Sequence, residues 1–281
     1  MYLDARSPHA MSANRMGCSG CVQRLNCPFN DVDRSGRKTG CTLSKTSEVL
    51  SAGDRLYRTG MVANAFYFVR SGTFKLCAVA GDGADQVVGF FGPGDVIGLN
   101  ALNDGVHPYD AIALDTASVC SVSVDALLGS EASDGPSGAQ INGAMTRALL
   151  VNFSRAARRD EKLRLMLARN SATERVAAFL LDMAHTNKLR GLVADELILP
   201  MSRADIASYL ALAVETVSRV LTRLQQQGVL KVNRRKVSIL DPARLTALTE
   251  QESATRASRQ GHVDETPRAV ENQPPRLSRV A

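Results

Sequence analysis

The chain has 281 residues, of which 44% are hydrophobic and 22% are charged, and its formal net charge is +6. That length allows two domains of ordinary soluble composition. No apolar run reaches the roughly 18 residues of a membrane-spanning helix, and the N-terminus lacks the apolar segment of a signal peptide. We therefore expect a cytoplasmic protein with no membrane partner, and the mild excess of base fits a polyanionic ligand.

Residues 1–47 are polar and carry most of the clustered cysteines. Three thiols lie close together, with two and five residues between them: Cys18, Cys21 and Cys27. This spacing suits one soft metal centre. A fourth ligand would be one of the remaining cysteines, Cys41, Cys77 or Cys120. From the residues alone, a tetrahedral zinc site, a [4Fe–4S] cluster and free thiols all stay open.

Residues 48–135 are expected to form an antiparallel β-roll that acts as a sensor domain. From Val49 to about Leu128, short runs of Val, Phe and Leu alternate with glycines. Such runs, interrupted by glycine, are typical of strands joined by tight hairpins.

Residues 136–169 are expected to form a dimerisation helix. Apolar residues recur there at spacings of 4, 3, 7 and 4: Leu149, Phe153, Ala156, Leu163 and Leu167. This is a heptad seam in which Asp160 occupies the missing position. Two facing copies of Asp160 would make the helix pair marginal, so we interpret Asp160 as a dimer switch. The alternatives are a helix packed on its own domain and an Asp160 that pairs with Arg164 in solvent.

Residues 170–248 are expected to form a winged helix-turn-helix. After a helix over about 172–188, Ser202 and Asp205 have the spacing of a capping box that starts a short helix. The next helix runs from Val214 to about Gln227. One of its faces is apolar, with Val217, Val220, Leu221 and Leu224, and the other carries Glu215, Ser218, Arg219 and Thr222.

That polar face has the chemistry needed to read base edges in the major groove. Arg can donate to guanine, Glu can accept from cytosine, and a Ser hydroxyl adapts to several bases. A basic hairpin follows as a wing, so that 202–240 holds seven basic and two acidic residues. A solvated amphipathic helix would explain the charges alone, but the ordered succession of modules favours double-stranded DNA as a partner. The last segment, 249–281, is polar and is expected to be disordered.

The order of modules resembles the CRP/FNR superfamily, and within it the iron–sulfur oxygen sensors of the FNR type, from about Cys18 to Leu248. The matching pieces are the three clustered cysteines and the segments 85–91, 93–98, 118–120, 170–179 and 214–219. The last segment, Val-Glu-Thr-Val-Ser-Arg, is the most specific. The fold class is therefore expected to be α+β: an N-terminal β-roll like a cyclic-nucleotide-binding domain, a long dimerisation helix, and a C-terminal winged helix-turn-helix.

The resemblance implies roles for particular residues. It makes Cys120 the fourth ligand of a [4Fe–4S] cluster that sustains a DNA-binding homodimer and is lost or converted in oxygen. It assigns the reading of a TTGAT half-site to Glu215, Ser218 and Arg219. RNA polymerase is a further expected partner.

Two departures from known members bear on the sensor function. The cyclic-AMP branch carries a Glu and an Arg-Ser pair that hold the nucleotide, whereas this chain has Leu99 and Asn100 and then the run His107–Asp110, so no cyclic nucleotide is expected. Polar Asn26 stands where FNR proteins have an apolar residue that limits oxygen access.

Other classes of function fit the sequence less well. The main alternative is a zinc-bound or thiol-redox transcription factor with the same DNA-binding module. A ferredoxin-like carrier would not need a helix-turn-helix. No enzyme is expected, because the histidines are dispersed and none lies beside a nucleophile motif.

Overall fold

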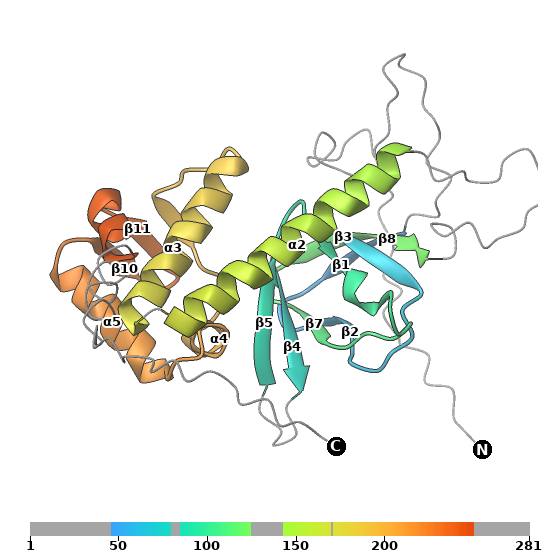
Figure 1. Cartoon of the computed structure of the whole chain (residues 1–281), viewed down its shortest axis with the longest axis horizontal. Coiled ribbons are helices and arrows are strands. Elements are labelled where there is room, and N and C mark those ends of the chain that lie inside the picture. The colour runs from blue at the N-terminus through green and yellow to red at the C-terminus, as the bar shows by residue number, and fades with distance from the viewer. Residues whose placement is uncertain (1–45, 80–84, 125–142, 170, 250–281) are drawn as a thin grey trace, which may run out of the picture.

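A computed structural model describes residues 46–79, 85–124, 143–169 and 171–249 (Figure 1). Figure 1 shows a β-roll and a second α/β unit joined by one long helix that runs along the roll and reaches the second unit. The expected α+β architecture is confirmed. The N-terminal cysteine segment and the C-terminal tail lie outside the described residues.

The roll consists of two four-stranded antiparallel sheets. In spatial order the first contains β1 (Thr46–Leu50), β8 (Ala117–Ser123), β3 (Ala65–Ser71) and β6 (Val96–Ile97). The second contains β2 (Arg55–Tyr57), β7 (Asp110–Ala113), β4 (Phe74–Val79) and β5 (Asp85–Phe91). The alternation of the strands buries residues such as Val69, Phe74 and Val119 between the sheets. The turn at Gly72 requires glycine, because φ is +75° and a Cβ would lie 2.5 Å from the backbone of Ala117.

The long helix α2 (Gly143–Arg169) contacts both units of the chain. Leu149, near its start, packs on a roll cluster that contains Phe66 and Phe68. Met166, near its end, packs on the core of the second unit. None of the helices in the described part of the chain is long and apolar enough to cross a membrane.

The second unit has the order of a winged helix-turn-helix. Its helices are α3 (Ala172–Leu189), α4 (Arg203–Tyr209) and α5 (Val214–Gln226), and its strands are β9 (Glu196–Ile198), β10 (Leu230–Asn233) and β11 (Lys236–Ile239). The strands form one antiparallel sheet in the order β10-β11-β9. The predicted apolar face of α5 is buried throughout, at Val217, Val220, Leu221 and Leu224. Each such side chain contributes about 1.5–3 kcal/mol of burial free energy.

Candidate functional site

The outer face of α5 presents the predicted base-reading residues together. Glu215, Ser218 and Arg219 are exposed on one side of the helix, opposite its buried stripe. Within the described part of the chain, neither Glu215 nor Arg219 forms an ion pair that would compete with a ligand. The Ser218 hydroxyl donates to the carbonyl of Val214 at 3.0 Å, and its lone pairs stay available to a donor. The face offers donors and acceptors to a groove.

The position of α5 is set by the helix before it and by a tight turn. Ser202 and Asp205 form the expected capping box at the start of α4. The turn passes through Ala211 at φ +51°, a left-handed conformation that is uncommon for residues with a Cβ. The Arg175 guanidinium stabilises this turn by donating to the carbonyls of Leu210 at 3.1 Å and Ala211 at 3.3 Å.

The β10–β11 hairpin forms the expected basic wing beside α5. Arg234 and Arg235 make its two-residue turn, and Arg234 adopts φ +51°. Exposed basic side chains occur on α5 and the wing at Arg219, Arg223, Lys231, Arg234, Arg235 and Lys236. The acidic Asp205 pairs instead with Lys75 of the roll, 2.6 Å away. The exposed positive charge suits phosphate contacts, and the polar face of α5 suits base edges.

Of the cysteines in the described residues, Cys120 is the better candidate ligand. Cys120 lies half-buried on β8, where it pairs in register with Ser47 of β1 and Phe68 of β3. In chain order, β1 is the first described strand after the cysteine cluster. Cys77 on β4 is 1% exposed, and burial raises its thiol pKa, which opposes the thiolate that a metal needs.

The described residues do not assemble a complete metal site. No group of three or more His, Cys, Asp or Glu side chains is arranged there to hold a metal ion. The ligands expected beside Cys120, which are Cys18, Cys21 and Cys27, lie outside the described residues, as does Cys41.

Two of the positions at which this chain departs from the cyclic-AMP branch are apolar or paired within the roll. Leu99, in the short 3-10 helix η2 (Leu99–Ala101), is 8% exposed and packs in the cluster that Leu149 of α2 covers. Asp110 pairs with Arg55 at 2.9 Å and accepts from the Thr59 backbone N–H at 2.7 Å. The cation in these contacts, Arg55, is already paired with Asp110 and so is not free to bind a phosphate.

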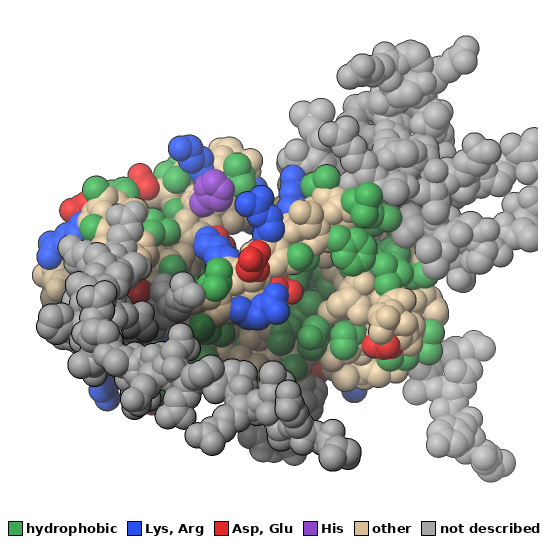
Figure 2. All heavy atoms as spheres, in the orientation of Figure 1, with side chains coloured by type: hydrophobic (Ala, Val, Ile, Leu, Met, Phe, Trp, Pro, Cys, Tyr) green, Lys and Arg blue, Asp and Glu red, His purple; other side chains and the backbone are tan. Residues whose placement is uncertain are grey.

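The exposed apolar side chains of α2 coincide with the predicted seam at Phe153. Leu149, Ala156, Leu163 and Leu167 are half-buried against their own chain, whereas Phe153 is 39% and Leu150 is 64% exposed. An exposed apolar stripe, Leu150 and Phe153, therefore includes one residue of the predicted seam and one residue beside it (Figure 2 shows hydrophobic side chains over the part of α2 beside the roll). Asp160 is exposed beside this stripe. Arg164 donates to the Asp160 backbone carbonyl at 3.3 Å, and no ion pair of the Asp160 carboxylate occurs among the described residues.

Comparisons with known proteins agree with this architecture. A model of the Crp-like helix-turn-helix domain matches residues 174–248, and a model of the cyclic nucleotide-binding domain matches residues 47–130. The chain is 37% identical over 230 residues to the "Transcriptional activator protein FnrA" of Stutzerimonas stutzeri, which covers 82% of this chain and 89% of that protein. It is 36% identical over 194 residues to the "Anaerobic regulatory protein" of Haemophilus influenzae, covering 69% of this chain and 72% of that protein.

A solved structure extends the similarity to three dimensions. FixK2 from Bradyrhizobium japonicum matches with a TM-score of 0.63 and 34% identity, covering 73% of this chain and 98% of FixK2. The similar proteins are named as transcription regulators, which agrees with the expectation that the chain is not an enzyme. The fold, the exposed face of α5 and these similarities together show that the chain belongs to the CRP/FNR family of DNA-binding transcription regulators.

Proposed function

We propose that the chain is an oxygen-responsive transcription regulator that binds, as a homodimer, a dyad of TTGAT-like half-sites when oxygen is low. The observation that carries the proposal is the exposed face of α5 with Glu215, Ser218 and Arg219 beside a basic wing. The names of similar proteins as anaerobic regulators support the oxygen response.

In this proposal base reading and phosphate contact are divided between two elements. Arg219 donates to a guanine, Glu215 accepts from a cytosine, and Ser218 contacts a neighbouring base edge. The wing arginines, Arg234 and Arg235, neutralise phosphates and so supply affinity without sequence preference. RNA polymerase is the further partner that an activator of this kind would contact.

A [4Fe–4S] cluster held by Cys18, Cys21, Cys27 and Cys120 would supply an oxygen-labile link between the N-terminal segment and the roll. Support comes from the half-buried place of Cys120 beside β1, which is the first described strand after the cysteine cluster, and from the unfavourable burial of Cys77. Four thiolates fit zinc as well. A zinc-bound or thiol-redox factor with the same DNA-binding module is therefore the competing function.

The proposal excludes cyclic nucleotides as the signal. The apolar packing of Leu99 and the internal pairing of Asp110 support this, because a nucleotide needs polar partners for its ribose and a cation for its phosphate.

The test compares DNA binding by the full chain purified without air with binding after exposure to air. The probe is a duplex with an inverted pair of TTGAT half-sites. We expect tight binding without air and a large loss after exposure, and we expect Cys120→Ser to abolish the anaerobic binding. Cys77→Ser is the matched control and should bind as the unchanged chain does. Equal binding in air and without air, or loss in Cys77→Ser and not in Cys120→Ser, would refute the proposed sensor.

A further inference from the structure

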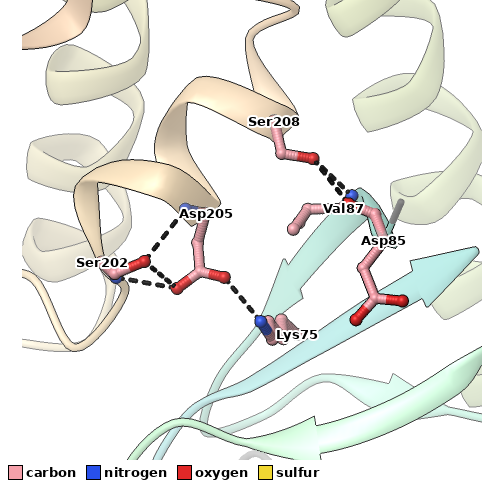
Figure 3. A network of polar contacts seen from close by, with 6 residues as sticks. All are labelled: Lys75, Asp85, Val87, Ser202, Asp205 and Ser208. Carbon is pink, nitrogen blue, oxygen red and sulfur yellow. Dashed lines mark hydrogen bonds and ion pairs between the residues drawn. The ribbon is translucent and has the colours of Figure 1, made fainter. Parts of the chain in front are cut away.

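The first helix of the helix-turn-helix is attached to the edge of the roll by directional hydrogen bonds (Figure 3). β5 is the last strand of its sheet, so its outward backbone groups have no strand partner. α4 supplies partners instead: the Val87 N–H donates to the Ser208 hydroxyl at 2.8 Å. The Gln86 side-chain amide donates to the Ser208 carbonyl at 2.6 Å. The Ser208 hydroxyl also donates to the Asp85 carbonyl at 3.3 Å. One residue of α4 thus holds three consecutive residues of β5.

An ion pair fixes the other end of the same helix. The Lys75 ammonium on β4 lies 2.6 Å from an oxygen of Asp205, and the two side chains are only 18% and 12% exposed. The other Asp205 oxygen accepts from the Ser202 backbone N–H at 2.8 Å, which closes the capping box. Burial alone would raise the pKa of Asp205, but hydrogen bonds from Lys75 and Ser202 lower it. One ionised carboxylate therefore both starts α4 and ties it to the roll.

Apolar packing brings the two units together beside these bonds. Phe90 of β5 lies with its ring centroid 6.2 Å from that of Phe179 and 5.1 Å from that of Tyr209. Such packing contributes affinity between the units but tolerates small rotations. The ion pair and the hydrogen bonds have fixed directions, so they select one orientation of α4 and of the α5 that packs on it.

We propose that Lys75, Asp205 and Ser208 are positioning residues for DNA binding, which set the orientation of the recognition helix relative to the dimerisation helix. A dimer reads two half-sites about one helical turn of DNA apart only if both recognition helices are held in register. The contact leaves Glu215, Ser218 and Arg219 exposed, so the attached orientation keeps the DNA-reading face open. This inference rests on the proposed function of α5.

The test uses the full chain, purified without air, with Lys75→Met to remove the charge and keep the side-chain stem. The control is Arg55→Met, because its ion pair with Asp110 at 2.9 Å lies wholly within the roll. We expect Lys75→Met to bind the half-site duplex about 5- to 50-fold more weakly. The salt dependence should not change, because Lys75 touches no phosphate. Lys75→Arg should restore most of the affinity.

Two further measurements separate positioning from general damage. The Val87 amide, measured by hydrogen exchange, should exchange faster in Lys75→Met and in Ser208→Ala but not in Arg55→Met. The thermal unfolding midpoint should be similar in Lys75→Met and Arg55→Met.

Three DNA-binding results would contradict the positioning role or the proposed function of α5. Unchanged or tighter DNA binding by Lys75→Met and Ser208→Ala would overturn the positioning role, and tighter binding would make the contact inhibitory. An equal loss in Arg55→Met would also overturn it. If the unchanged chain shows no preference for the half-site duplex, the proposed function of α5 fails, and the positioning role fails with it.

Discussion

Replacement of Arg219 by Ala should separate sequence reading from folding. Arg219 is exposed on α5, and it makes no ion pair within the described part of the chain. Because no buried contact is lost and Ala is a better helix former than Arg, stability should change by less than about 0.5 kcal/mol. The variant should therefore fold and dimerise as the unchanged chain does.

The effect on DNA is expected to be large. Loss of a bidentate contact to guanine costs about 1–3 kcal/mol at one base pair. A homodimer loses the contact in both half-sites, and separated contacts add, so the total is about 2–6 kcal/mol. Since about 1.4 kcal/mol is a tenfold change, the dissociation constant should rise at least about 20-fold.

The assay compares duplexes that carry the intact dyad with duplexes in which one base pair of each half-site is changed. The unchanged chain should discriminate at every position of the half-site. Arg219→Ala should lose discrimination at the contacted guanine alone and keep it elsewhere. Arg234→Ala, in the wing, is the control: it should weaken all duplexes alike and flatten the salt dependence. An equal loss of specificity in both variants would refute this division of labour.

Other changes probe the turn, the dimer and the roll. Arg234→Gly should raise the free energy of unfolding by about 1 kcal/mol in urea, because the turn holds φ +51°; a lower stability would contradict the assigned strain. Asp160→Ala should dimerise and bind its operator in air without a cluster, because it removes the two carboxylates that would face each other in the proposed dimer. A monomeric variant in analytical ultracentrifugation would refute the dimer switch. Burial lowers the pKa of His107 below its usual 6.5. Between the two values the unfolded chain binds more protons, so stability should fall as the pH drops below about 6.5. His107→Phe should flatten that dependence, and an unchanged slope would exclude His107 as its source.

The parts of the fold that depend on local signals could be predicted from the sequence. The capping box of Ser202 and Asp205 and the apolar stripe of α5 involve residues a few positions apart, and both are confirmed. The wing was predicted because a basic turn separates two short apolar runs. Strand β9 was not predicted, since three residues are too few to show a period.

Contacts between distant segments could not be predicted. Lys75 and Asp205 are 130 positions apart, and no local pattern links them. Four of the five predicted seam residues of α2 are half-buried within the chain, because a helix that packs on two surfaces has a wide apolar face, and the seam stays a prediction. Periodicity alone does not show which apolar residues of such a face pack within the chain and which would contact a second chain. The exposure of Leu150, which lies beside the predicted seam, becomes apparent only in the folded chain.

An oxygen-labile cluster that controls a DNA-binding dimer can be tested by measuring iron and acid-labile sulfide per chain in protein purified without air. We expect equal amounts of both, in the proportion of one [4Fe–4S] cluster per chain, and their loss in Cys120→Ser but not in Cys77→Ser. Zinc in place of iron, or a chain that binds its half-site duplex without any metal, would contradict the proposed cluster.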